Sequence, residues 1–342
     1  MTDSLTHVAS HSRLSVVAPC HNEALNLPEL LRVLEASLQA LKRPFEVIVV
    51  DDGSTDTSFT QLSNAALTRP WLQVLRLARN YGKEAALTAG LDHASGDAVV
   101  LMDGDLQHPP ELLSALVDAW SNGADMVVAI RTDRAGDGLL RRAGTRLFYR
   151  LLNAMSEQHI PMDAGDFRLL SRRAVASIQA LPERSRFMKG LYALVGLKLV
   201  TVNYQPNARI AGRSQFGPRK LWRLAIDGIA SFTSVPLRIW SYIGLALAVP
   251  AGLCALWIVV RTLVYGVDTP GYASLATMIL FFSGVQLIGL GVIGEYLGRV
   301  YIETKRRPLY VISDTLGDVA KTPDAAHGGI RLPARPSPEQ QH

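Results

Sequence analysis

Two stretches near the carboxyl-terminal end of the chain are too long and too apolar for the core of most soluble domains. Residues 241–260 are twenty positions without a charge, and residues 272–294 are twenty-three. An α-helix rises about 1.5 Å per residue, so each stretch can cross a hydrocarbon core of about 30 Å. A pair of buried core helices is the alternative, although such helices seldom run this long without a charge. The pattern predicts a two-helix transmembrane hairpin over residues 236–300.

Basic residues gather on both sides of the hairpin, while the short loop between the spans carries one base and one acid. Positively charged flanks stay inside, which predicts an inner (plasma) membrane protein with both termini cytoplasmic. Bases mixed with Trp, Phe and Ile over residues 219–235 predict an amphipathic helix in the headgroup layer, with a plain surface helix as the alternative. The net charge is +5, and basic residues cluster next to the expected spans. We therefore expect a lipid bilayer as partner and no nucleic acid.

The two ends of the chain are expected to be tails. Residues 1–12 are polar and carry no apolar run of the kind that forms a signal peptide, so the first domain should remain cytoplasmic. Residues 301–342 are expected to form a cytoplasmic tail that is largely disordered after residue 313, because Pro, Ala, Asp and His dominate there.

Between the first tail and the interfacial helix, residues 13–218 alternate short apolar runs with helical patterns. The apolar runs cover residues 14–18, 45–50, 72–77, 98–102 and 126–130. The helical patterns cover residues 27–41, 56–67, 83–94 and 111–122. This alternation predicts an α/β, Rossmann-like cytoplasmic domain with a mostly parallel sheet. Ligands of such sheets bind beyond the carboxyl ends of the strands.

Carboxylates follow three of these apolar runs. Asp103 and Asp105, after the fourth run, can hold Mg²⁺ or Mn²⁺ together with a diphosphate, and a solvated turn is the alternative. Asp52, after the second run, can accept from a nucleobase or a ribose hydroxyl, or can serve only turn chemistry. Ser54 or Thr55 can cap the helix that follows. Glu23, after the first run, can also hold a nucleoside.

The order of these loops resembles the nucleotide-sugar domain of the family 2 glycosyltransferases. Residues 17–23 (VAPCHNE), 49–56 (VVDDGSTD) and 103–107 (DGDLQ) are similar to the first three loops of that family. Further matches are residues 80–86 (NYGKEAA), 163–170 (DAGDFRLL), 187–192 (FMKGLY) and 307–310 (RPLY). With the two spans they resemble the bactoprenol glucosyltransferases, relatives of dolichol-phosphate mannose synthase. The resemblance covers roughly residues 13–312 and implies a GT-A type domain.

The resemblance implies a role for each residue that matches. The nucleoside site would be lined by Pro19, His21, Glu23, Val50 and Asp52. The diphosphate and its metal ion would be held by Asp103, Gly104 and Asp105, and the donor site would also include Lys83, Arg131 and Arg209. His21 stands where the family usually has Tyr. Gln215 replaces a usual Lys, and Arg213 or Lys220 would supply that cation instead.

The acceptor step has a simple chemical requirement. A polyprenyl phosphate is already an oxyanion at neutral pH, so it needs orientation and charge screening and no strong base. Asp163 and Asp166 are the candidates for a carboxylate near the attacking oxygen, although Asp166 can instead pair with Arg168. Together with Asp105 and Arg131 they form the expected catalytic set.

These expectations combine into one reaction. An inverting transferase would move glucose from UDP-glucose to undecaprenyl or another polyprenyl phosphate at the inner face of the membrane. Mannose, an N-acetylhexosamine or an aminoarabinose derivative remains open as the sugar, and a nucleotide-sugar-binding membrane scaffold without turnover is the rival from another class. Gly294 and Gly298 form a Gly-x-x-x-Gly pair, which predicts a homo-oligomer through the hairpin, with helix flexibility as the alternative.

Overall fold

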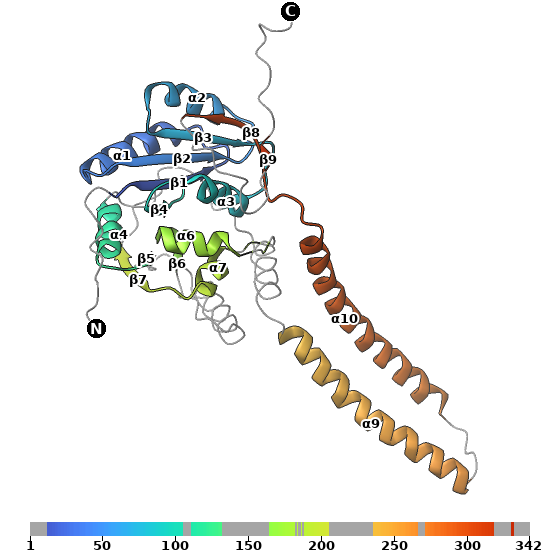
Figure 1. Cartoon of the computed structure of the whole chain (residues 1–342). Helices are drawn as coiled ribbons and strands as arrows, with labels where there is room; N and C mark the ends of the chain where they lie inside the picture. Colours follow the sequence, from blue (N-terminus) through green and yellow to red (C-terminus); the bar gives the residue numbers. More distant parts are fainter. Residues whose placement is uncertain are drawn as a thin grey trace, which may run out of the picture.

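The structure is a computed structural model that describes residues 12–104, 111–131, 164–181, 183, 186, 188–204, 235–265, 271–317 and 330–331. It shows an α/β domain from which a pair of long helices projects (Figure 1). The predicted interfacial helix over residues 219–235 lies outside the described residues, apart from residue 235.

A mixed sheet forms the centre of the domain. Its strands are β1 (Leu14–Cys20), β2 (Phe45–Asp51), β3 (Leu72–Leu77), β4 (Ala98–Leu101), β5 (Met126–Arg131), β6 (Ala164–Ser171), β7 (Leu199–Tyr204), β8 (Val311–Leu316) and β9 (Ile330–Arg331). The order across the sheet is β7-β5-β6-β4-β1-β2-β3-β8-β9. Strands β3, β2, β1 and β4 run parallel, whereas β6 is antiparallel to both of its neighbours and β8 is antiparallel to β3.

Helices cover both faces of this sheet. They are α1 (Leu27–Ala40), α2 (Ser58–Thr68), α3 (Lys83–His93), α4 (Glu111–Ser121), α6 (Arg172–Gln179) and α7 (Met188–Leu194). One buried cluster joins α1, α2 and α4 to one face of the sheet, and a second joins α3, α6 and α7 to the other face. The predicted fold class, an α/β domain with a mostly parallel sheet, is confirmed.

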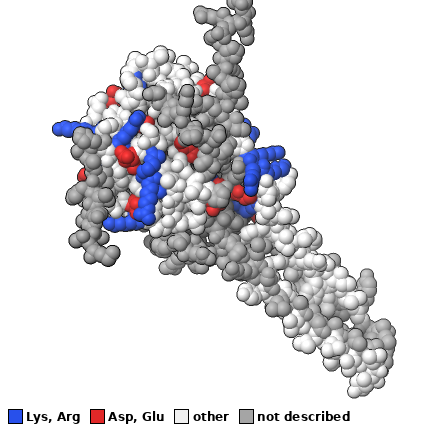
Figure 2. Space-filling model, viewed as in Figure 1, with Lys and Arg blue, Asp and Glu red and all other residues white. Residues whose placement is uncertain are grey.

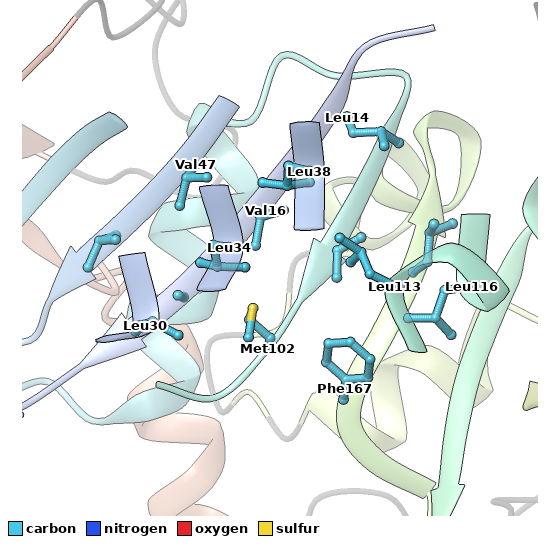
Figure 3. Close-up of a cluster of buried hydrophobic side chains, with 14 of the residues drawn as sticks. Leu14, Val16, Leu30, Leu34, Leu38, Val47, Met102, Leu113, Leu116 and Phe167 are labelled. Atoms are coloured by element: carbon cyan, nitrogen blue, oxygen red, sulfur yellow. The ribbon is translucent and has the colours of Figure 1, made fainter. Parts of the chain in front are cut away.

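The burial pattern explains why these segments fold as they do. The central strands are apolar on both faces, as strands covered by helices on each side must be, and Val16, Val49 and Val100 are completely buried. Leucines of α1 recur at helical spacing and pack onto β1 and β2, and leucines of α4 pack beside Phe167 of β6 (Figure 3). Helix α3 is buried from Ala86 to His93.

The predicted helices and strands of the first 131 residues agree with the structure within two residues at each end. The predicted cap of α2 was wrong. Thr57 occupies the N-cap position without a side-chain hydrogen bond. The Ser54 hydroxyl instead accepts from the Asn22 amide, and Thr55 donates to the Asn22 side chain, because the loops after β1 and β2 lie against each other.

The boundary of the carboxyl-terminal tail requires a second correction. Residues 313–316 were expected to begin a largely disordered tail, but they belong to β8 at the edge of the sheet. The unpaired backbone groups of β3 explain the difference, because an edge strand offers a template for one more strand. Tyr310, just before β8, is completely buried, and Ile312 is almost so.

Along the chain, two long helices come between β7 and β8. Helix α9 (Val235–Tyr265) and helix α10 (Tyr272–Thr304) run side by side in opposite directions (Figure 1). Helix α9 continues through Pro250. Within the described residues, the segment Phe281–Thr304 is long and apolar enough to cross a membrane. In the view of Figure 2, charged side chains gather on the α/β domain and where the helix pair joins it, whereas the far part of the pair shows none.

Candidate functional site

The candidate site lies at the carboxyl edge of the parallel strands. Because β1, β2 and β4 run in the same direction, the loops that follow them meet at one edge of the sheet. These loops carry His21, Glu23, Asp52 and Asp103. Backbone hydrogen bonds tie them together, since Asp52 N donates to the Cys20 carbonyl and Met102 N to the Val17 carbonyl, at 2.9 and 3.1 Å.

Asp103 is paired with a lysine that comes from α3. The Lys83 Nζ lies 2.5 Å from Asp103 Oδ1, and the two side chains are 40% and 32% exposed. A charged pair that retains this much contact with water is weakly held. Asp103 can therefore exchange its ammonium partner for another cation, and Lys83 can turn to another anion.

Asp52 holds the loop that starts α3. Its Oδ1 accepts from Tyr81 N at 2.7 Å and its Oδ2 accepts from Gly82 N at 2.9 Å. The side chain is only 4% exposed. Gly53, at φ +64°, allows the approach, because a Cβ there would lie 2.4 Å from the Arg79 carbonyl carbon. Asp52 thus fixes the loop and the first turn of α3, on which Lys83 lies.

His21 and Asn22 form a hydrogen-bonded corner at the same edge. His21 Nδ1 donates to the Asp52 carbonyl at 2.9 Å, and Asn22 Nδ2 lies 3.3 Å from His21 Nε2. Asn22 has a φ of 56°, a left-handed conformation that Asn tolerates better than most residues. The imidazole is exposed and hydrogen-bonded to the loop after β2, so a face of the ring can stack on a planar ligand.

The remaining residues of the expected nucleoside site differ in exposure. Glu23 is partly exposed, and its Oε2 accepts from Asn26 Nδ2 at 2.5 Å. Pro19 is also partly exposed, whereas Val50 is completely buried in the core. Gly104 is buried against the Pro19 carbonyl and Leu30. A ligand at this edge can reach Pro19 and Glu23 directly, whereas the Val50 side chain supports the strand beneath them.

Several expected site residues lie outside the described part of the chain. These are Asp105, Asp163 and Arg209. The backbones of Arg131 and Asp166 are described, at the end of β5 and near the start of β6. Both strand ends fall on the carboxyl edge of the sheet, because Ile130 pairs with Ala164.

Two features of the site were not foreseen from the sequence. One is the hydrogen bonding of both Asp52 oxygens to backbone amides, which no residue pattern signals. The other is Arg168, which is buried in β6 and stacks on Tyr192 with its guanidinium carbon 3.6 Å from the ring centroid. Side chains alternate between the two faces of a strand, so the sequence of β6 places Arg168 on the same face as Leu170.

Cys20 lies beside these carboxylates but is not a candidate nucleophile. Burial, together with the nearby carboxylates of Asp51 and Glu23, raises the pKa of the Cys20 thiol far above its ordinary value. The reactive form of cysteine is the thiolate, so Cys20 remains a packed thiol at the end of β1.

Of the two expected metal ligands, the structure describes Asp103. Within the described residues no three His, Cys, Asp or Glu side chains form a cluster that could hold a metal ion. Asp103 provides an oxygen ligand that already has a cationic partner. A Mg²⁺ or Mn²⁺ ion bound by one or two carboxylates and by substrate phosphates fits such a donor set.

The chain is similar to known proteins over most of its length. The model for glycosyl transferase family 2 matches residues 15–178. A bactoprenol glucosyl transferase of Shigella phage SfV is 45% identical over 302 residues, which cover 88% of this chain and 98% of the relative. An uncharacterized glycosyltransferase of Synechocystis is 46% identical over 304 residues, 89% of this chain and 96% of the relative.

Solved structures are more distant. Glucosyl-3-phosphoglycerate synthase from Mycobacterium tuberculosis aligns with a TM-score of 0.48 at 23% identity, over 64% of this chain and 78% of that one. The mannosyltransferase PcManGT from Pyrobaculum calidifontis aligns with a TM-score of 0.46 at 21% identity, over 84% and 87%. The similarity to the curated relatives, over almost nine tenths of this chain, decides the classification: the chain belongs to glycosyltransferase family 2.

Proposed function

We propose that this protein transfers glucose from a nucleotide-sugar to bactoprenol, a polyprenyl phosphate, at the inner face of the membrane. The observation that carries the proposal is the similarity to bactoprenol glucosyl transferases. Relatives of that name from Shigella phages SfV, SfII and SfX are 44% to 46% identical over 88% of this chain. An alignment of this length includes the α/β domain and most of the apolar hairpin, so it involves the parts that would handle both substrates.

The donor would bind across the loops at the carboxyl edge of the sheet. Its base would stack on His21, and its ribose hydroxyls would donate to Glu23. Asp52 would hold the Tyr81–Gly82 amides in place beneath it. Asp103 and Lys83 would meet the diphosphate, with Arg131 and Arg209 as further cations. UDP-glucose is the donor that the family resemblance favours.

A divalent cation is part of the proposal. Asp103, with Asp105 two residues on, would hold Mg²⁺ or Mn²⁺, which would neutralise charge that develops on the departing nucleoside diphosphate. Lys83 would then move from Asp103 towards a phosphate oxygen, which keeps one cation beside each anion.

The acceptor phosphate would attack the anomeric carbon directly. One displacement without a covalent enzyme intermediate inverts the configuration, so an α-linked donor gives a β-linked lipid. Arg131 would orient the acceptor phosphate, and Asp163 or Asp166 would lie near the attacking oxygen. Because the nucleophile is already ionised, these groups act by position and charge.

The hairpin would hold the domain at the inner leaflet. Helix α9 has 31 residues and α10 has 33, so each is long enough to cross a bilayer. Lys305, Arg306 and Arg307 directly follow α10 and would lie in the headgroup layer, which keeps both termini in the cytoplasm. Gly294 and Gly298 are exposed with no atom near their Cβ positions, which supports self-association through α10.

One experiment identifies both substrates. Full-length protein in nanodiscs is incubated with a panel of UDP- and GDP-sugars and undecaprenyl phosphate, and the lipid product is identified by mass. We expect a hexose added from UDP-glucose. A different sugar on the lipid would correct the donor alone, whereas tight donor binding without any lipid product would favour the rival, a non-catalytic nucleotide-sugar-binding scaffold.

A further inference from the structure

After α10 the chain returns to the α/β domain and becomes part of it. Strand β8 pairs antiparallel with β3, where Val74 lies opposite Leu316 and Leu77 opposite Ile312. The Ala78 amide donates to the Val311 carbonyl at 2.8 Å. We call residues 309–317 the return segment. A helix of the membrane hairpin is therefore joined, within a few residues, to an edge strand of the catalytic sheet.

Tyr310 anchors the return segment in the core. Its side chain is completely buried in the cluster formed with α3, α6 and α7. The Tyr310 hydroxyl donates to Asp92 Oδ2 at 2.8 Å, and Gln179 Nε2 lies 3.3 Å from the other oxygen of Asp92. Asp92 is only 4% exposed, so its carboxylate relies on these donors in place of water.

Asp92 lies on the last turn of α3, and the first turn of that helix carries the donor-site lysine. Helix α3 spans eleven residues from Lys83 to His93, a length of about 16 Å at 1.5 Å per residue. It is buried along most of its length. A Cβ at Gly90, for example, would overlap the Val17 side chain, and the Glu84 carboxylate accepts from Met188 N at 3.2 Å.

We propose that Tyr310 is a positioning residue that ties the end of membrane helix α10 to α3, and through α3 sets the place of Lys83 and of the Tyr81–Gly82 amides at the donor site. The coupling uses one hydrogen bond in a closely packed core. A close-packed interior transmits a displacement along a rigid element instead of absorbing it. The kinetic part of this inference rests on the proposed function, whereas the structural part does not.

Three variants of the full-length protein test the proposal in nanodiscs. Tyr310→Phe keeps the ring and removes the hydroxyl. Asp92→Asn keeps an acceptor for Tyr310 and serves as the conservative variant. Tyr301→Phe removes a hydroxyl from an exposed ring of α10 and is the matched control. Hydrogen–deuterium exchange is followed over residues 79–93, and the KM values for donor and acceptor are measured separately.

We expect Tyr310→Phe to raise amide exchange about tenfold along α3, including Tyr81 and Gly82, because a hydrogen bond to a buried carboxylate is lost. The donor KM should rise several-fold while the KM for polyprenyl phosphate stays constant. Asp92→Asn and Tyr301→Phe should behave like the natural protein.

Two results would overturn the inference. Exchange that increases only around Tyr310 and β8, with residues 81–84 still protected, would limit Tyr310 to local packing. An equal rise in both KM values would also contradict a role confined to the donor site. If the natural protein transferred no sugar, the proposed function would fail, but the exchange data would still decide whether Tyr310 positions α3.

Discussion

The two edges of the parallel strands use their carboxylates in different ways. At the amino edge, Glu46 of β2 is 1% exposed. Its two oxygens accept from five donors at 2.5 to 2.9 Å, which are Arg13 Nη2, Ser15 Oγ, Gln73 Nε2, Ser95 N and Ser95 Oγ. At the carboxyl edge, the Asp103 side chain is 32% exposed, and it forms an ion pair with Lys83, which is also partly exposed to solvent.

This difference in exposure and bonding distinguishes Glu46, a structural carboxylate, from Asp103, which is available to bind a ligand. The donors around Glu46 come from β1 and the residue before it, from β3, and from the loop between α3 and β4, so the network joins neighbouring parts of the sheet. Asp103 instead has a partly exposed lysine as its partner. A buried network is valuable only when it is fully satisfied, whereas a ligand site needs a partner that can be exchanged.

The largest effect on activity should come from the carboxyl edge of the sheet, which we call the open edge because its carboxylate Asp103 is partly exposed. Asp103→Asn should lower sugar transfer by about 10³-fold, because one charged ligand of the diphosphate and its metal ion is lost. The thermal unfolding temperature should change little, since Asp103 is partly exposed. Asp118→Asn, the same change at an exposed position of α4, is the control and should keep full activity.

A kinetic measurement with both variants decides this prediction. An Asp103→Asn protein with more than a tenth of the natural rate would remove Asp103 from the reaction. The addition of excess EDTA to the natural protein should have an effect as large as the substitution. Full activity in EDTA would exclude the proposed cation.

At the amino edge, which we call the closed edge, a substitution should change the stability of the protein and not its activity. Glu46→Ala should lower the free energy of unfolding by about 3 kcal/mol, because several buried donors lose their acceptor. The activity of the protein that remains folded should be nearly unchanged. Glu29→Ala, which removes an exposed carboxylate from α1, should barely alter thermal unfolding. A loss of turnover in Glu46→Ala without a loss of stability would erase the distinction between the edges.

Much of the fold could be predicted because local patterns were clear. Strands such as β2 and β3 are short apolar runs followed by turn residues, and α1 shows helical spacing of leucines. Strand β6 gave no such signal, since Arg168 interrupts its apolar run and the ring of Tyr192 in α7, on which Arg168 stacks, lies far along the chain. Strand β8 was missed because its residues resemble a polar tail, and only the free edge of β3 makes them a strand.

The site was predictable in its location but not in its connections. The rule that ligands bind at the carboxyl ends of strands located Asp52 and Asp103 at one edge. The contacts between loops depend on backbone conformation, such as the positive φ of Gly53 and Asn22. No pattern in the sequence indicates that Asp52 binds two amides or that Lys83 reaches Asp103.

The smallest expected effect concerns pH, and it extends the comparison to a third carboxylate. Burial raises the pKa of Asp92, and hydrogen bonds from Tyr310 and Gln179 and the charge of Arg186 oppose the rise. A carboxyl with a raised pKa is more stable in the folded protein when protonated, so its contribution favours the folded state at low pH and declines as pH increases through the raised pKa. Tyr310→Phe removes one opposing hydrogen bond and should raise that pKa further.

The cost of Tyr310→Phe should therefore grow with pH. Near pH 5 we expect a smaller loss of thermal stability than near pH 8, with a difference of about 1 kcal/mol. Arg186, Glu183 and Tyr192 also face this cluster, so the test compares the variant with the natural protein at each pH. When Tyr310→Phe is added to Asp92→Asn, its cost should not depend on pH, because residue 92 then carries no ionisable carboxyl. An equal loss at every pH would mean that the hydroxyl does not act through the ionised carboxylate.

The most direct test of the proposed function is to identify the product that forms at the carboxyl edge of the sheet. Full-length protein in nanodiscs is given UDP-glucose labelled with ¹³C at the anomeric carbon, together with undecaprenyl phosphate, and the product is examined by NMR. We expect a β-linked glucosyl phosphodiester on the lipid, one UDP released for each lipid formed, and no such signal with Asp103→Asn. An α-linked product would contradict the single displacement, and label found only in free glucose would contradict transfer to the lipid.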